Sequence, residues 1–541
     1  MRMTLFILFL TLFTNPIFSQ NSSYIMSEGD AYDENEGFLP KEGKLYVTPM
    51  SGSQAIYNKE NIGGYFLEGE TLVSVKGKTI VTHDAKTLKN RKSIPIKNFP
   101  ENRKNIGCIQ FQGEYIMFFS SILTKKSKTL QCFFQKLDIQ TGKLGNEVAI
   151  LEVENKRLNL RKNGFHHVSF FPLPEFKLSK DGSKLLFSCH EKLCVYEKGM
   201  DLSWKTDKIY GKHTPKRFYD LQNGMLDNDG TYYAILKVFK NDDNPKLEWH
   251  HWESHSELIS KKDRRCNYNI IVLKIDKNGV SKIEADSLKD ILLHSLTLHK
   301  DANDRLLCVG LYFKDDALFR SAGFLSVDLE KNTAPTYYPI ATENQDEAEK
   351  KGGTPTKGIK YLNGIEIKNT KDGNLLLISE QVNGFYLFPS KGTVSDIGNH
   401  SDVLVSKINL DGDLLWAKRL QKSQIFNLNP KNGEAYGCES YKYLELNGKH
   451  YIIYLDDKKN KDFDFDEIKT YCSSCKNGGV FAFILDEDGN GKKEMLFDLD
   501  KLTATTHYDF KVDMRTISDT EFIFPVFQKK KNEGLIKIKV K

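Results

Sequence analysis

Short apolar segments recur along this sequence at intervals of roughly 40 to 80 residues, and a polar turn follows each of them. The segments are rich in β-branched and aromatic side chains, which favour β-strands. They read TLVSV, EYIMFF, SKLLFSC, TYYAILKVF, RLLCVGLYF, NLLLISE, HYIIYL and EFIFPVF. Each unit is too small to bury its own apolar side chains, so such a chain must stack its units into an array of β-sheets.

A second strand and a tight turn follow most of these segments. They read TIVTHDAKTLK, FFQKLDIQTGKL, LCVYEKGMDLSW, IIVLKIDKNGVSK, GFLSVDLEKNTAP, VLVSKINLDGDLLW and VFAFILDEDGNGKKE. The turns use Asp, Asn, Lys and Gly; Asp and Asn side chains hydrogen-bond the nearby backbone, and Gly accepts a positive φ. Residues 201–205 (DLSWK) and 413–418 (DLLWAK) match at the same point of the unit, which is the clearest internal repeat.

The two ends of the chain hold an incomplete unit and a spare strand. An eighth unit, residues 520–540, stops after its second strand, and the lone strand GKLYVTP, residues 43–49, lies near the N-terminus. This pattern predicts a single all-β propeller with eight blades, whose ring the N-terminal strand closes. Closure would remove exposed sheet edges. Seven blades is the alternative count, and an open β-solenoid is the alternative architecture.

The first 20 residues, MRMTLFILFLTLFTNPIFSQ, have the pattern of a secretory signal peptide. Arg2 precedes an apolar stretch that is too short to span a bilayer, and small polar residues follow it. We expect a signal peptide over residues 1–20, a short segment over 21–42 and the propeller over 43–541. The expected mature protein is exported, either periplasmic or secreted, and has no transmembrane segment.

The charge pattern argues against a nucleic-acid partner. Lys and Arg total 78 and Asp and Glu total 72, so the net charge is only +6, and the basic residues are mixed with acidic ones. A nucleic-acid footprint needs a basic stripe. The sequence also lacks the Gly-x-Ser-x-Gly motif of serine hydrolases, the His-Glu-x-x-His motif of zinc proteases and the glycine-rich phosphate-binding loop Gly-x-x-x-x-Gly-Lys-Ser/Thr.

The segment SDVLVSKINLDGDLLWAKRL, residues 401–420, resembles the β-propeller repeat of exported bacterial proteins. In that repeat a strand ends in Lys-Leu-Asp, a glycine-containing turn follows, and the next strand opens with Leu-Leu-Trp. Residues 407–409 (KIN), Gly412 and residues 414–416 (LLW) match this pattern. The resemblance implies the fold and an exported context; it implies little about activity, because propellers host many functions.

The chain contains nine cysteines, and export would allow disulfides. Cys472 and Cys475 form a Cys-x-x-Cys pair, which we interpret as a local disulfide; a metal or redox role is the alternative. If Glu191 and Lys192 form a two-residue turn, Cys189 and Cys194 face each other across a hairpin at disulfide distance. The alternative for that pair is two reduced, buried thiols.

The segment DEDGNG copies the start of a calcium-binding loop. Asp486, Asp488 and Asn490 occupy alternate positions and Gly491 follows, but Phe497 stands where such a loop carries a bidentate Glu. The segment also falls on one of the recurring hairpin turns. We interpret it as a turn, with a structural calcium ion as the alternative; no other cofactor is expected.

Long insertions predict a loop-rich rim on one face of the ring. Residues 154–172, 241–266, 380–402 and 456–479 connect strands that would share one face, while other blades use short turns there. Long loops in a compact fold are usually functional or disordered. We therefore expect a partner to bind at this rim.

The richest insertion contains LEWHHWESHSE, residues 247–257. Trp249 and Trp252 could stack on a sugar or a peptide, and His251 with His255 has a metal-ligand spacing if the segment is helical. A local ordered loop is the third interpretation. A second rim segment, GFHHVSFFP, adds a further histidine pair, His166 and His167.

Three functions are compatible with this pattern. We favour an exported, non-enzymatic propeller that binds a protein or glycan partner through the rim. A propeller glycoside hydrolase that uses rim carboxylates, such as Glu248, Glu253 or Asp464, is one alternative. A sensor or assembly subunit of the cell envelope is the other.

Overall fold

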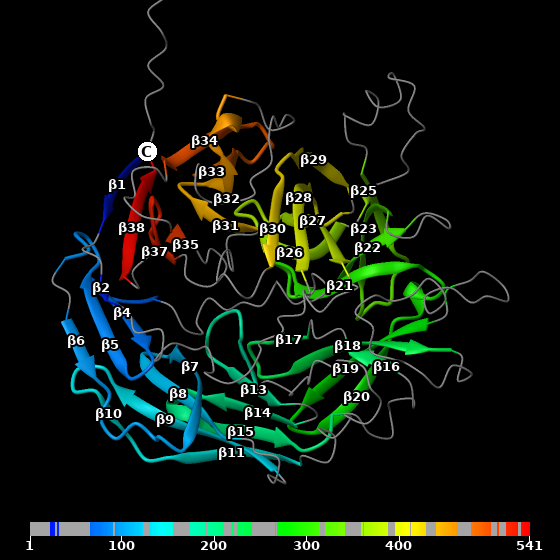
Figure 1. The fold of residues 1–541 in the computed structure, drawn as a ribbon. Helices are drawn as coiled ribbons and strands as arrows, with labels where there is room; N and C mark the ends of the chain where they lie inside the picture. The colour runs from blue at the N-terminus through cyan, green and yellow to red at the C-terminus, as the bar shows by residue number, and fades with distance from the viewer. Residues whose placement is uncertain are drawn as a thin grey trace, which may run out of the picture.

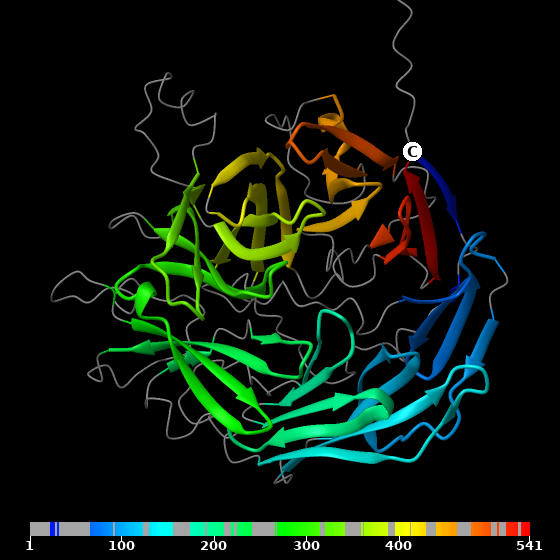
Figure 2. The ribbon, with the colours of Figure 1, turned by 180° about the vertical axis from the view of Figure 1, so that it is seen from behind.

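The structure is a computed structural model. It describes residues 22–26, 30–31, 65–89, 92–122, 129–154, 174–189, 192–209, 218–220, 224–240, 266, 268–313, 320–340, 359–360, 362–387, 395–411, 413–428, 440–462, 478–498, 506–507, 515–528 and 532–540. The described strands form eight antiparallel sheets arranged as the blades of a β-propeller, which confirms the predicted fold and blade count (Figure 1). Figure 2 shows the same ring from behind.

The first four blades follow one another in chain order. Blade 1 contains β3 (Tyr65–Glu68), β4 (Thr71–Lys76), β5 (Thr79–Asp84) and β6 (Lys92–Pro95). Blade 2 contains β7 (Arg103–Phe111), β8 (Glu114–Ser121), β9 (Thr129–Asp138), β10 (Lys143–Leu144) and β11 (Val148–Glu154). Blade 3 contains β12 (Glu175–Leu178), β13 (Leu185–Cys189), β14 (Lys192–Glu197) and β15 (Asp201–Thr206). Blade 4 contains β16 (Phe218–Asp220), β17 (Met225–Leu226), β18 (Tyr232–Phe239), β19 (Tyr268–Asp276) and β20 (Gly279–Glu284).

The next three blades continue the ring. Blade 5 contains β21 (Leu293–Lys300), β22 (Leu306–Phe313), β23 (Arg320–Asp328), β24 (Thr336–Pro339) and β25 (Ile359–Lys360). Blade 6 contains β26 (Leu362–Asn369), β27 (Leu375–Leu387), β28 (Ser395–Ile408), β29 (Leu414–Leu420) and β30 (Gln424–Leu428). Blade 7 contains β31 (Tyr441–Leu446), β32 (Lys449–Asp457), β33 (Gly478–Leu485) and β34 (Gly491–Asp498). Short 3-10 helices occur at η4 (Lys198–Met200), η5 (Asp286–Leu288) and η6 (Lys458–Asn460).

The eighth blade joins both ends of the chain. It contains β35 (Thr506–His507), β36 (Arg515–Ser518), β37 (Glu521–Gln528), β38 (Asn532–Val540), β1 (Ser22–Met26) and β2 (Asp30–Ala31). Strand β1 runs antiparallel to β38, with Ser22 opposite Val540. The strand that the sequence suggested for this place, residues 43–49, lies outside the described residues. Closure of the ring by an N-terminal strand stays a prediction.

Both faces of the blades are buried, which explains the continuous apolar runs in the sequence. Successive side chains of a strand point to opposite faces. In β8, Met117 and Phe119 therefore pack toward blade 1, while Ile116 and Phe118 pack toward blade 3. The buried apolar side chains form eight clusters, one between each pair of neighbouring blades.

Blade 8 also packs against blade 1. Leu72 and Leu88 of blade 1 share an apolar cluster with Ile523 and Leu535 of blade 8. The Nζ of Lys537 donates a hydrogen bond to the carbonyl oxygen of Ala85 at 3.3 Å. The first and last blades are therefore in direct contact. Within the described residues, no helix has the length and apolar character that crossing a membrane would need.

Candidate binding face

The antiparallel order of the strands gives the ring two different faces. The turns between the first and second strands of a blade, and between the third and fourth, lie on one face, which we name the tight-turn face. The connections between the second and third strands, and between blades, lie on the other, which we name the long-loop face. Short segments such as 277–278 and 447–448 cross the tight-turn face, whereas 240–267 and 458–477 belong to the long-loop face.

The tight-turn face is built from the turns that the sequence predicts. The carboxylate of Asp138 accepts the backbone N–H groups of Gln140 and Thr141 at 2.9 and 3.2 Å. Asp276 does the same with Asn278 at 2.7 Å. These contacts satisfy the polar backbone of each turn locally, as expected of Asp in such positions. The turns of the tight-turn face are thus stabilised by hydrogen bonds within each turn.

The DEDGNG segment forms one of these turns. The Oδ1 of Asp486 accepts the backbone N–H groups of Asp488 and Asn490 at 3.0 and 2.8 Å, and Glu487 is paired with the buried Lys407 of blade 6. The predicted turn is therefore confirmed. A calcium ion at Asp486, Asp488 and Asn490 stays a prediction. Across the described part of the chain, no group of three or more His, Cys, Asp and Glu side chains is arranged to hold a metal ion.

The long-loop face carries a β-ribbon in blade 6. Strands β27 and β28 continue as a ladder to Leu387 and Ser395, and β30 pairs with Asp396–His400 of β28. The expectation of a loop over residues 380–402 was therefore wrong for most of its length. The continued ladder pairs the backbone groups of the insertion with each other, which a loop would leave to solvent.

A buried ionic network fixes the base of this ribbon. The carboxylate of Glu380 accepts hydrogen bonds from the Nζ of Lys422 and from the Oγ of Ser440, both at 2.6 Å. Lys422 also donates to the Oε1 of Gln424 at 2.9 Å, and the Nε2 of Gln424 donates to the backbone oxygen of Leu455 in blade 7 at 2.9 Å. Lys422 and Gln424 are fully buried. The network thus joins β27, the connection after β29 and blade 7.

Two further ion pairs with buried carboxylates lie beside this network and at the start of the next insertion. Asp402 of β28 pairs with Arg419 of β29 at 2.6 Å; burial raises the pKa of the Asp402 carboxyl, and the guanidinium opposes that shift. Asp456 pairs with Lys493 at 3.1 Å and accepts the side-chain amide of Asn460 at 2.8 Å, which holds η6. Burial raises the pKa of Asp456 as well. Each carboxylate is already held by protein cations or donors.

The predicted binding residues of the rim fall outside the described residues. Trp249, His251, Trp252 and His255 lie between β18 and β19, and His166 with His167 lies between β11 and β12. The Cys472–Cys475 pair and the acids Glu248, Glu253 and Asp464 lie outside them too. The structure does describe the buried ionic contacts at the bases of two insertions, Glu380 with Lys422 and Asp456 with Lys493. The sequence carried a weak signal of that support, because Glu380 directly follows the apolar segment NLLLIS.

The predicted Cys189–Cys194 disulfide is wrong in its register. Strands β13 and β14 pair in a different register from the expected one. Cys189 therefore lies opposite Lys192, and Cys194 lies opposite Phe187. The two cysteines lie diagonally on one face of the sheet and are not cross-strand partners.

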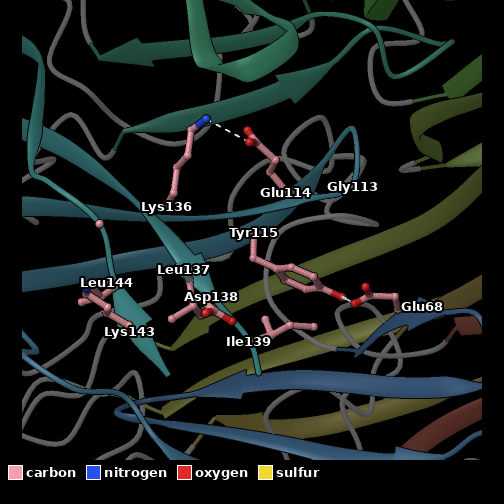
Figure 3. Close-up of a pocket in the computed structure, with 11 residues that line it drawn as sticks. Glu68, Gly113, Glu114, Tyr115, Lys136, Leu137, Asp138, Ile139, Lys143 and Leu144 are labelled. Carbon is pink, nitrogen blue, oxygen red and sulfur yellow. Dashed lines mark hydrogen bonds and ion pairs between the residues drawn. The ribbon is translucent and has the colours of Figure 1, made fainter. Parts of the chain in front are cut away.

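Sequence reasoning missed a cavity of about 490 Å³ on the tight-turn face, between blades 1 and 2 (Figure 3). Tyr115 points toward Glu68, and its hydroxyl donates to the carboxylate at 3.0 Å. Burial and the Glu68 carboxylate raise the pKa of Tyr115. Glu114 pairs with Lys136 at 2.9 Å. The residues that line this cavity come from several turns that are distant in sequence, so no local sequence motif could predict it.

Comparisons with known proteins identify no family for this chain. No protein-family model matches the chain, and no curated protein matches it. The polysaccharide lyase Uly1 is 8% identical, with 96% of this chain and 99% of that chain covered and a TM-score of 0.35. The WD40 domain of SCAP from fission yeast is 8% identical, with 89% and 95% covered and a TM-score of 0.34. The Dos1 propeller is 7% identical, with 76% and 89% covered and a TM-score of 0.31. These likenesses carry no information on activity or ligand, and the resemblance to exported bacterial repeats stays a prediction.

Proposed function

We propose that this protein is an exported, non-enzymatic β-propeller that binds a protein or glycan partner through its long-loop face. The observation that carries the proposal is the difference between the two faces. Turns on the tight-turn face are short and satisfied by their own side chains, whereas blades 4, 6 and 7 carry insertions on the other face. Ordering long connections costs conformational entropy that stability alone does not require.

The buried charges of blades 6 and 7 support this proposal. A buried ion pair contributes less to stability than well-packed apolar side chains of similar volume would. Glu380 with Lys422 and Asp456 with Lys493 nevertheless occupy buried sites at the bases of two insertions. Their geometry fixes where those insertions leave the ring. A rigid base of this kind lowers the entropy lost when a surface binds its partner.

Trp249 and Trp252 are the residues that we assign to the contact, with His251, His255, His166 and His167 around them. Large rigid aromatic side chains contribute most of the binding free energy at interfaces and lose little entropy on binding. The two carboxylates at the base of the ribbon do not favour a hydrolase, because Glu380 and Asp402 are buried and each is held by a cation.

The experiment compares aromatic residues inside and outside the face. The full exported chain and its Trp249→Ala/Trp252→Ala variant are tested in affinity electrophoresis against a panel of cell-envelope and extracellular polysaccharides, and in pull-downs against cell-envelope proteins. Tyr337→Ala is the matched control, because Tyr337 is an exposed aromatic residue on the outer strand β24, away from this face. We expect the double variant to lose at least tenfold in affinity and the control to lose none.

Equal binding by the double variant and the wild type would remove the two tryptophans from the proposal. Shortening residues 241–266 to a glycine-containing turn then decides the role of the whole insertion. If the shortened protein melts at the wild-type temperature and still binds every partner of the wild type, the long-loop face of blade 4 is not the binding site.

A further inference from the structure

Three cysteines from two neighbouring blades meet in one apolar core. Cys132 belongs to β9 of blade 2, while Cys189 and Cys194 belong to β13 and β14 of blade 3. Their exposed fractions are 0%, 1% and 2%, and all three lie in the cluster that fills the interface between these blades. Cys132 is separated from the other two by some 60 residues in sequence, so only the packing of the blades brings it to them.

The contacts within this group single out one pair. Cys132 and Cys189 lie in the same buried cluster between blades 2 and 3, and the neighbouring Cys189 thiol raises the pKa of the Cys132 thiol. The Sγ of Cys194 instead contacts the backbone oxygen of Ile150 in blade 2 at 3.8 Å. The register of the β13–β14 hairpin excludes a direct cross-strand pair of Cys189 with Cys194. The sulfur that faces Cys189 is therefore that of Cys132.

We propose that Cys132 and Cys189 form a disulfide bond that links blade 2 to blade 3 in the exported protein. The proposal rests on the predicted export and does not depend on the binding face. The oxidant is a protein disulfide of the export compartment. A thiolate of one cysteine attacks that disulfide to give a mixed disulfide, and the second cysteine then displaces the oxidant. The two thiols together lose two electrons and two protons, and the oxidant leaves as a dithiol.

Because both sulfur atoms are buried in the folded ring, the disulfide must form before blades 2 and 3 finish packing. Only the thiolate reacts with a disulfide, and the pKa of Cys132 is raised by its contact with Cys189 and by burial. Once the core between blades 2 and 3 is closed, neither sulfur is accessible to a protein oxidant. The bond therefore forms while the two blades assemble, and the folded ring then protects it from reductants.

Peptide mapping tests the pairing on the wild-type protein. The full chain is exported into an oxidising compartment, denatured in an alkylating agent without reductant, and digested with trypsin. Cleavage after Lys and Arg places the three cysteines in separate peptides, residues 129–136, 185–192 and 193–198, while Cys472 and Cys475 share residues 470–476. We expect 129–136 linked to 185–192, with 193–198 alkylated. Alkylation of both Cys132 and Cys189, or a link from 129–136 to 193–198, would overturn the proposal.

Variants give a second readout, with Cys194→Ser as the matched control. Reductant added during unfolding should lower the melting temperature of the wild type and of Cys194→Ser, because both contain the bond. It should lower the melting temperature of Cys132→Ser and Cys189→Ser by less, because in these variants only the predicted local Cys472–Cys475 bond is left to reduce. If either of these two fails to fold, the mapping of the wild type still decides. Equal responses of all four proteins to reductant would count against the bond, whatever the fate of the binding proposal.

Discussion

At the residue scale, the structure gives roles to charged and aromatic side chains that the repeat pattern does not explain. Lys422 is a fully buried lysine whose ammonium is held by Glu380 and Gln424. Trp204 and Trp416 are the repeated tryptophans of the DLSW and DLLW segments. The indole of Trp204 donates to the backbone oxygen of Gly230 at 3.1 Å, and that of Trp416 to the backbone oxygen of Glu487 at 2.9 Å. Each bond reaches a tight turn of the next blade, so the repeated tryptophan joins neighbouring blades.

The buried network predicts a large loss of stability when its cation is removed. The variant Lys422→Met keeps a long unbranched side chain at this position but removes its ammonium group. The Glu380 carboxylate then stays buried without its cation. Loss of one partner of a buried pair costs about 3 to 5 kcal/mol, and we expect a decrease of that size in the free energy of unfolding, measured in urea. The added change Glu380→Gln should restore part of it, because the unpaired charge is then gone.

The control is Lys86→Met, which removes the cation of the exposed pair Lys86–Glu70. Solvent screens exposed pairs, so this change should leave the urea midpoint almost unchanged. If Lys422→Met and Lys86→Met had equal effects, the network would not be the support that we assign to it.

At the element scale, the tight turns and the neighbouring blade are fitted to each other. Gly489 lies in the turn after β33 with a φ of +77°, and a Cβ added there would lie 2.6 Å from the Cδ2 of Trp416. Gly373, in the turn before β27, has a φ of +82° and open space around it. The two glycines share a backbone conformation and differ in what surrounds them. Comparing substitutions at Gly489 and Gly373 therefore distinguishes two reasons for glycine: the positive φ, which both positions have, and the close contact with a neighbouring side chain, which only Gly489 has.

We expect Gly489→Ala to destabilise the protein more than Gly373→Ala. Both changes put a side chain into the left-handed region, at about 1 to 2 kcal/mol. Only Gly489→Ala adds an overlap with the indole, which overpacking data place at about 1 to 3 kcal/mol more. Melting temperatures measure the difference. Adding Trp416→Leu to Gly489→Ala should make the combined loss smaller than the sum of the two single losses. If Gly489→Ala and Gly373→Ala lowered the melting temperature equally, the Trp416 indole would be able to move aside at little cost in free energy.

At the scale of the whole molecule, the ring depends on contact between its first and last blades. Blade 8 receives β1 on the outer edge of β38 and packs on blade 1 through a small apolar cluster. An unpaired edge at β38 would expose backbone N–H and C=O groups, which invites pairing with other chains. Two N-terminal segments are candidates for the strand that closes the ring. The sequence pattern suggested residues 43–49, whereas the structure pairs residues 22–26 with β38.

Two deletions that keep the signal peptide distinguish these segments. Removing residues 21–31 should lower the melting temperature by several degrees and promote aggregation, because β1 and β2 are lost and the β38 edge is exposed. Removing residues 32–50 should change neither. Light scattering during heating measures both effects. The opposite result would assign closure to residues 43–49, and unchanged melting of both proteins would reject closure by an N-terminal strand.

The apolar runs in the sequence predict the second and third strands of the blades, because these runs are continuous and both faces of strands such as β8 and β33 are buried. The sequence also determined the tight turns, whose Asp and Asn side chains act within a few residues. It did not reveal the innermost strands, because segments such as β12 and β36 are short and mixed in polarity.

Only the tertiary structure decided which distant residues meet. It placed Cys132 of blade 2 against Cys189 of blade 3, and it joined Glu380 to Ser440 across two blades. The register of β13 and β14 pairs Cys189 with Lys192 and not with Cys194, which excludes the predicted cysteine pair, since register sets every partner along a hairpin. Periodicity along a chain reports which side chains are buried. The identity of their partners depends on how blades pack in three dimensions, and no local pattern encodes it.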